Sequence, residues 1–300
     1  MSHPHHDDRK RRALVLGATG QIGRFLLPEL LAQEVDVEAV SRQAHPPHEH
    51  VLWSRFDLYH NGDAARRPDV VFSAGPIDGL LAWLARTRHR PTRVVAFSST
   101  SAQIKQNSPD PAERELAARL LQAEQALALH CDARDIGWTI LRPTLVYGCG
   151  LDANLSRIVA LARRWRFVPL PRDAHGLRQP VHAQDLAIGA WQAANTPASL
   201  GKRYDLCGAD TLEYTEMVRR TVGFLMPPAY LLRVPSGVFR GLARLLRRYD
   251  LIPGFGPAML DRMRQDLVFS TAAASRDLGW SPRGFRPDAS DFPKPPHPFF

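Results

Sequence analysis

The 300-residue sequence is poor in cysteine and has no long apolar run. Its three cysteines, Cys131, Cys149 and Cys207, stand far apart, a spacing that fits neither a zinc site nor a disulfide framework and suits a reducing compartment. No stretch reaches the roughly 18 apolar residues that cross a bilayer, and the start, MSHPHHDDRKRR, lacks the apolar segment of a secretory signal. We therefore expect a cytoplasmic protein with a disordered basic tail at residues 1–12 and no metal site.

Lysine is also scarce, which leaves the basic charge to arginine. Lysine occurs only at positions 10, 105, 202 and 294, whereas Lys and Arg together number 39 and the net charge is +9. Such a surplus suits nucleic acid, membrane phosphates or an anionic small ligand. Because the arginines are spread along the chain without interleaved aromatic residues or a recognisable nucleic-acid module, nucleic acid is not an expected partner.

In the first half of the chain, apolar runs alternate with helical segments. The expected strands read ALVLGATG, VEAVSR, VLWSRFDL, DVVFSAGP, RVVAFSST and WTILRPTLVYG, and helices such as QIGRFLLPELLAQ and LLAWLART lie between them. Strands that alternate with helices are typical of a parallel sheet covered on both faces. The predicted fold class is therefore α/β, with a doubly wound parallel (Rossmann) sheet over residues 13–150.

Beyond Tyr147 the alternation loosens. NLSRIVALARR, AQDLAIGAWQAA and YTEMVRRTVGFL read as helices and KRYDLCG as a short strand, while the proline-rich end RPDASDFPKPPHPFF is expected to be irregular. Residues 151–300 are therefore predicted to form mainly a smaller substrate-binding domain, with elements near 179–208 that rejoin the sheet.

The heptapeptide GATGQIG follows the first expected strand and opens the first expected helix. In that context Gly17 permits a tight turn, Gly20 lets the backbone approach a pyrophosphate, and Gly23 allows the helix to pack closely on the strand. The N–H groups at the start of the helix would bind the anion. A purely structural glycine turn is the alternative.

The end of the second expected strand distinguishes between cofactors. An NAD site usually places an acidic residue there, about 20 residues past the glycines, to bind the ribose hydroxyls. The sequence has Ser41 and Arg42 instead; a hydroxyl and a guanidinium bind the 2′-phosphate of NADP, which a carboxylate would repel. NADP is therefore expected in preference to NAD, unless Arg42 is an ordinary solvated arginine.

These pieces together resemble the extended short-chain dehydrogenase/reductases, the group that includes nucleotide-sugar epimerases and dehydratases. The matching pieces occur in the family's order over most of residues 13–285: GATGQIG, VSR, FDL, VVFSAG, VVAFSST, LRPTLVYG, RQPVHAQDLA and DLGWSP.

The resemblance implies a set of contacts to the cofactor and two structural residues. Asp57 and Leu58 would lie against the adenine, and Pro143 would line the nicotinamide side. His182 and Asp185 match a family signature, and Asp185 is expected to cap the helix that follows. The full set of expected cofactor contacts is Gly17, Thr19, Gly20, Gln21, Ile22, Gly23, Ser41, Arg42, Asp57, Leu58, Ala74, Gly75 and Pro143.

The family transfers protons through a Tyr-x-x-x-Lys pair on the helix after the fifth strand, helped by a Ser or Thr at the end of that strand, here Thr100. The segment ERELAARLLQAEQAL, residues 113–127, reads as that helix, and its alignment with the family places Leu116 at the tyrosine and Leu120 at the lysine. Leucine cannot transfer a proton, and residues 60–146 contain no tyrosine. The helix is therefore expected to occupy the catalytic position without the catalytic pair.

Three interpretations follow from the missing pair. The chain binds NADP and a ligand as a sensor or assembly subunit without redox chemistry, or other groups carry the proton, or the fold is kept only as a scaffold. Candidates for substitute groups are Tyr147, Lys105, Glu115 and Arg119, although a tyrosine at position 147 is more often a packing or substrate-lining residue.

Arginines suggest the ligand. By resemblance, Arg178 reaches nucleotide phosphates, and Arg262 and Arg264 supply a second clamp. The alternatives are an ion pair for Arg178 and a solvated helix face for the other two. A basic amphipathic helix expected near residues 236–248 packs on the core or, less often, lies on anionic lipid.

The expected function follows from these residues and the resemblance. It is NADP-dependent binding or conversion of a nucleotide sugar or other anionic small molecule by an oxidoreductase- or epimerase-like chain with a degenerate active site, plausibly a homodimer. The alternatives are a non-catalytic, NADP-responsive regulatory protein and a peripheral membrane or assembly factor with a vestigial cofactor site.

Overall fold

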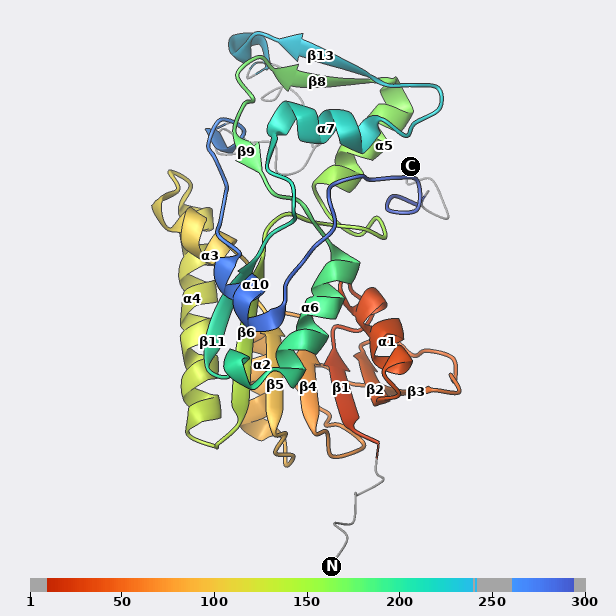
Figure 1. Cartoon of the computed structure of the whole chain (residues 1–300), viewed down its shortest axis with the longest axis vertical. Coiled ribbons are helices and arrows are strands. Elements are labelled where there is room, and N and C mark those ends of the chain that lie inside the picture. The colour runs from red at the N-terminus through yellow and green to blue at the C-terminus, as the bar shows by residue number, and fades with distance from the viewer. Residues whose placement is uncertain (1–9, 240, 242–260, 294–300) are drawn as a thin grey trace, which may run out of the picture. The chain divides into compact units, whose positions relative to one another are not determined.

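A computed structural model describes residues 10–239, 241 and 261–293 (Figure 1). Its largest element is a seven-stranded parallel sheet with the order β11-β6-β5-β4-β1-β2-β3, and Figure 1 shows this order from one edge to the other. The strands are β1 (Arg12–Leu16), β2 (Asp36–Ser41), β3 (Val51–Arg55), β4 (Val70–Ser73), β5 (Arg93–Phe97), β6 (Gly137–Pro143) and β11 (Lys202–Leu206).

The strand order confirms the predicted fold class. The chain winds outward from β1 through β2 to β3, returns to β4 on the other side of β1, and continues to β6, which is the doubly wound arrangement. The central strands are buried because both faces are covered: Leu14, Val71 and Val95 are wholly inaccessible to solvent. The strand order reverses between β1 and β4, and their carboxyl ends therefore mark the expected ligand-binding edge.

The chain divides into two compact units. The first contains Met1–Ser98, Gln122–Leu141 and Ala187–Tyr204, and the second contains Ser99–Leu121, Arg142–Leu186 and Asp205–Phe300. The sheet brings β11 beside β6, so a strand from the 179–208 region joins the sheet.

Helices α1 (Gly23–Ala32) and α2 (Ile77–Arg86) belong to the first unit, whereas α4 (Pro111–Asp132) and α6 (Ala183–Asn195) contribute to both. The start of α4 is well defined, because Pro111 occupies its first position and the Asp110 carboxylate accepts the Ala112 N–H at 2.9 Å. The helix predicted over residues 113–127 is thus confirmed and is longer at both ends.

The second unit has its own core, built from α5 (Leu155–Trp165) and α7 (Tyr214–Val222) against short strand pairs. The pairs are β7 (Val146–Tyr147) with β10 (Val181–His182), β9 (Leu177–Arg178) with β12 (Leu212–Glu213), and β8 (Phe167–Pro171) with β13 (Tyr230–Val234). The remaining described elements are α3 (Ser101–Ile104), η1 (Lys105–Asn107), η2 (Pro197–Ser199) and α10 (Ala272–Leu278).

Two sequence predictions fall largely or partly outside the described residues. The tail at residues 1–12 is described only from residue 10, and the basic helix near 236–248 only at residues 236–239 and 241. Among the helices that the structure does describe, none has the length and apolar character needed to cross a membrane.

Candidate functional site

The glycine turn lies between the carboxyl ends of β1 and β4. Gly17 has φ +77°, and a Cβ there would lie 2.7 Å from the Gly75 nitrogen and 2.8 Å from the Ala74 carbonyl carbon. A Cβ at Gly23 would lie 2.3 Å from the Gly17 oxygen. Close packing within the protein therefore requires glycine at positions 17 and 23.

Gly20 is different, because the fold itself leaves it more room. Within the described part of the chain, its Cβ would meet one atom within 4 Å, the Gly17 oxygen at 3.1 Å. Helix α1 begins directly after this turn, with no side-chain cap on its N-terminus and no acidic residue in its first turn. The positive end of the helix dipole is thus not neutralised by a side chain, as an anion-binding helix N-terminus requires.

The predicted 2′-phosphate contacts lie at the end of β2. Ser41 is buried, and its Oγ accepts the Gln43 N–H at 3.1 Å and lies 3.0 Å from the His45 Nε2. Arg42 is exposed, and its carbonyl accepts a bond from the Arg55 Nε at 3.2 Å. The structure therefore places a second guanidinium, Arg55, and an imidazole, His45, close to the predicted pair.

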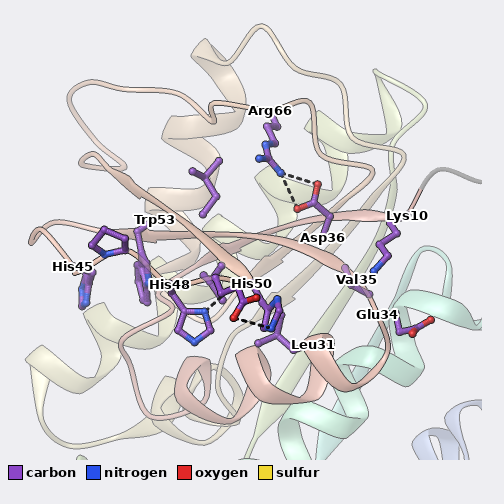
Figure 2. Close-up of a pocket in the computed structure, with 14 residues that line it drawn as sticks. Lys10, Leu31, Glu34, Val35, Asp36, His45, His48, His50, Trp53 and Arg66 are labelled. Atoms are coloured by element: carbon purple, nitrogen blue, oxygen red, sulfur yellow. Dashed lines mark hydrogen bonds and ion pairs between the residues drawn. The ribbon is translucent and has the colours of Figure 1, made fainter.

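His45 was not identified from the sequence. Its ring stacks on Trp53 of β3 with centroids 4.0 Å apart and planes inclined by 17°, and Figure 2 shows the two side by side. The only sequence signal was a histidine four residues after Ser41 within a loop that also contains His48 and His50.

The predicted adenine contacts lie near the same turn. The Leu58 Cδ1 lies 3.8 Å from the position of a Cβ on Gly75, which places Leu58 beside the β4 end. The Asp57 carboxylate accepts the Tyr59 N–H at 2.8 Å, and this bond, more than the nearby charges of His60 and Arg42, lowers the pKa of Asp57 below its ordinary value. Asp57 is therefore an ionised residue that stabilises its own turn.

A hollow of about 820 Å³ lies elsewhere in the first unit, at the amino ends of β2 and β3 (Figure 2). Asp36, which begins β2, lines it and pairs with Arg66 at 2.8 Å, and His48 and His50 line it from the β2–β3 loop. Ligands of open α/β sheets bind outside the carboxyl ends of the strands. His45, which lies 3.0 Å from the Ser41 Oγ, also lines the hollow, so the hollow extends from the amino ends of these strands to the predicted 2′-phosphate contacts.

A buried carboxylate on α4 was also missed. The Glu124 side chain is 1% exposed, accepts the Ser98 Oγ–H at 2.6 Å, and lies 3.4 Å from the Arg203 Nε. The available signal was an acidic residue one turn after Leu120, next to the apolar face of α4.

In the second unit, α4 carries Leu116 and Leu120 as half-buried side chains. Thr100 is buried, and its Oγ donates to the Pro143 carbonyl at 3.2 Å, which also accepts the Thr100 N–H. The structure therefore brings the predicted Thr100 and Pro143 together and gives the threonine hydroxyl a partner within the protein.

Tyr147 lies in an aromatic cluster. Its ring meets His182 at 5.0 Å and Phe285 at 4.9 Å between centroids, both edge to face, and the residue is 2% exposed. Burial, reinforced by the Asp291 and Asp185 carboxylates, raises the pKa of the Tyr147 phenol well above its usual range. These contacts match the packing role that the sequence offered as the alternative to catalysis.

Three predicted cationic residues gather around Glu113. The Lys105 Nζ lies 3.5 Å from the Glu113 Oε1, Arg262 forms an ion pair with the same oxygen, and Arg178 donates to the Arg262 carbonyl. Burial alone would raise the pKa of Glu113, but a bond from Ser108 and the charges of Arg262 and Lys105 lower it. Glu113 is therefore ionised, and with Asp266 acting on Arg178 the cluster contains three cationic and two acidic side chains.

Arg178 and Arg264 also have partners within the protein. Arg178 donates to the Leu177 and Gln265 carbonyls at 2.7 and 2.8 Å, and its guanidinium lies 5.4 Å from the centre of the Tyr214 ring. Arg264 lies apart from this cluster and pairs with Asp173 at 2.5 Å. Arg178 is therefore held by carbonyls rather than by the ion pair that the sequence offered as its alternative.

The expected capping role of Asp185 is wrong. Helix α6 begins two residues earlier, at Ala183, and the Asp185 carboxylate accepts the Arg283 N–H at 2.9 Å and the Arg283 Nε–H at 2.8 Å. The His182 Nδ1 accepts the Gln184 N–H at 3.1 Å instead. Both signature residues are thus structural, but Asp185 holds the C-terminal segment.

Comparison with known proteins agrees with this geometry. The family model described as the NAD dependent epimerase/dehydratase family matches residues 13–207. The chain is 25% identical over 143 residues to the mitochondrial NADH dehydrogenase [ubiquinone] 1 alpha subcomplex subunit 9 of Dictyostelium discoideum, a match covering 47% of this chain and 40% of that protein. It is 23% identical over 176 residues to the UDP-glucose 4-epimerase of Vibrio cholerae, covering 57% of this chain and 51% of the relative.

The fold is shared along nearly the whole chain with a solved structure of MoeE5 in complex with UDP-glucuronic acid and NAD. That structure has a TM-score of 0.70 and 20% sequence identity, and the match covers 94% of this chain and 97% of the other. The chain spans about half the length, or less, of the two curated relatives above. The match over residues 13–207, together with the doubly wound sheet and its glycine turn, shows that this chain belongs to the NAD dependent epimerase/dehydratase family.

Proposed function

We propose that the chain binds NADP at the carboxyl edge of β1, β2 and β4. The observation that carries this proposal is the N-terminus of α1, which begins three residues after Gly20 and has neither a side-chain cap nor an acidic residue in its first turn. A pyrophosphate accounts for such a helix N-terminus, and a glycine at position 20 lets it approach the backbone closely.

The choice of NADP over NAD rests on the end of β2. Residues 41–45 contain no carboxylate, and the 2′-phosphate would meet the Ser41 hydroxyl and the Arg42 guanidinium, with Arg55 and His45 close by. Arginine suits phosphate because it offers paired donors and a charge that persists at all physiological pH values.

For the second ligand we propose a nucleotide sugar or another anionic small molecule. The similar proteins include a UDP-glucose 4-epimerase and a structure that holds UDP-glucuronic acid. The cluster of Lys105, Arg178 and Arg262 supports an anion, because two carboxylates, Glu113 and Asp266, act on its three cations and leave one positive charge unbalanced.

A second candidate function is NADP-responsive binding without turnover. It is favoured by Leu116 and Leu120 at the positions of the proton-transfer pair, and by the burial of Tyr147 among aromatic rings. Under this proposal the cofactor site is kept because the glycine turn and Arg42 do not depend on α4.

Calorimetric titration with NADP and NAD tests the cofactor proposal. A charge-assisted phosphate contact contributes about 1.5–3 kcal/mol, so Arg42→Ala should weaken NADP binding roughly ten- to a hundredfold and leave NAD binding unchanged. Arg67→Ala, an exposed arginine in the β3–β4 connection, is the matched control and should change neither affinity. Equal losses for both cofactors in Arg42→Ala would refute the 2′-phosphate assignment.

Turnover assays separate the two candidate functions. Loss of a positioned general acid costs about 10²–10⁴ in rate, so we expect no ordinary reductase turnover of generic carbonyls or common UDP-sugars, with NADPH absorbance and product analysis as readouts. Robust turnover would refute the non-catalytic function, and Thr100→Ala, Tyr147→Phe and Lys105→Ala would then identify the residue that carries the proton.

A further inference from the structure

The β8–β13 pair in the second unit has one covered face and one open face. Val168 and Leu170 of β8 belong to the core with α5 and α7, and Figure 1 shows these helices together on one side of the pair. Alternate residues point the other way. On that side Phe167 is 42% exposed, Tyr230 72% and Leu232 52%.

These side chains form one continuous surface. Tyr230 is directly opposite Phe167 in the parallel register, and Leu232 follows two residues along the same face. Trp165, 40% exposed, stacks on Phe167 with ring centroids 6.2 Å apart and planes inclined by 23°. We name these four residues, Trp165, Phe167, Tyr230 and Leu232, the apolar face.

The sequence around the apolar face is mostly basic. No acidic residue occurs between Asp152 and Asp173 or between Glu216 and Asp250, and Asp173, two residues after β8, pairs with Arg264. Arg164 and Arg172 lie near the two ends of β8 and are exposed. Neither has a carboxylate within ion-pair distance among residues 10–239, 241 and 261–293.

This combination identifies the kind of partner. Exposed aromatic and aliphatic side chains flanked by unpaired, exposed arginines suit the boundary between lipid headgroups and acyl chains. A second copy of the chain suits the face poorly, since a two-fold contact would bring like charges together. We infer that the apolar face and its arginines dock on a membrane surface rich in anionic phospholipid.

Vesicle sedimentation tests the inference on the full chain. The protein should bind vesicles of phosphatidylcholine mixed with phosphatidylglycerol, bind poorly to phosphatidylcholine alone, and release at high salt. Each arginine near an anionic surface contributes about a fivefold gain in binding, so Arg164→Gln with Arg172→Gln should lower binding about 25-fold. Tyr230→Ser with Leu232→Ser should lower it about tenfold.

The matched control removes the same charge from the first unit. Arg67→Gln with Arg88→Gln, both exposed, should bind vesicles like the unmodified protein. NADP titration of every variant separates this inference from the proposed cofactor function and shows that the variants fold.

Four outcomes would overturn the inference. The first three are no binding to anionic vesicles, equal losses in the control pair, and full binding by both the arginine pair and the Tyr230 and Leu232 pair of variants. Self-association in sedimentation that Tyr230→Ser with Leu232→Ser abolishes would also overturn it, because a second copy would then cover the face.

Discussion

Replacement of Gly17 by alanine tests whether the glycine turn is held by packing as well as by backbone conformation. Gly201 is the matched comparison. Gly17 has φ +77° and Gly201 φ +69°, so an alanine meets the same backbone penalty at both positions. The difference is space: no atom of residues 10–239, 241 and 261–293 lies within 4 Å of a Cβ at Gly201, whereas a Cβ at Gly17 lies 2.7 Å from the Gly75 nitrogen.

The expected losses in the free energy of unfolding follow from the backbone conformation and from the space available for a Cβ. A left-handed conformation costs an L-residue about 1–2 kcal/mol, and the lower entropy of the unfolded alanine chain offsets about 0.4–1 kcal/mol of that. Gly201→Ala should therefore lower the free energy of unfolding by about 1 kcal/mol. Overpacking against backbone adds about 1–3 kcal/mol, so Gly17→Ala should lower it by about 2–4 kcal/mol.

Urea unfolding of both variants, followed by circular dichroism, gives the two values side by side. The clash at position 17 is with backbone atoms of the β4 end, which cannot rotate away as a flexible side chain would. Equal destabilisation of the two variants would refute the packing argument and would leave the positive φ as the only reason for glycine in this turn.

Two further predictions concern ionisation. Hydrogen bonds from two neighbouring arginines lower the pKa of Glu216 to about 2 from 4.5, so Glu216→Gln should cost about 1 kcal/mol at neutral pH. That difference in unfolding free energy should disappear as the pH falls from 4.5 towards 2, because protonation removes the same bonds. Burial raises the pKa of Cys131 and Cys207 to about 12. An aromatic disulfide reagent at mild alkaline pH should therefore label only Cys149 in the folded protein and all three cysteines in urea.

Local sequence was sufficient for the sheet. Residues of β1, β4 and β5 are apolar and β-branched in uninterrupted runs, as strands buried on both faces must be, and helical spacing between them identified α1, α2 and α4. The glycine turn was equally readable from its motif. The packing at Gly23 is local, because a Cβ there would meet the Gly17 oxygen, whereas a Cβ at Gly17 would meet Gly75 at the end of β4, far along the chain.

The missing proton-transfer pair stays a prediction from the sequence. Leu116 and Leu120 were placed by their distance from the AEQAL segment, and a helix fixes which residues share a face. Neither the helical periodicity nor the helix itself determines how two leucines at these positions affect turnover.

The second unit depended on tertiary structure. Strands β8 and β13 pair across some 60 residues of chain, and β8 contains two prolines, Pro169 and Pro171, which weaken a strand prediction. Their pairing follows from the packing of Val168 and Leu170 on α5 and α7. Local periodicity carries no information about which distant segment will cover such side chains.

Long-range contacts also decided the roles of single residues. Asp185 binds Arg283 rather than capping a helix, and Tyr147 packs on Phe285, in each case across more than 90 residues of chain. The sequence could name these residues because their motifs are local. Only the folded chain could supply their partners, since a hydrogen bond or a ring contact depends on positions in space that the spacing of residues along the chain does not specify.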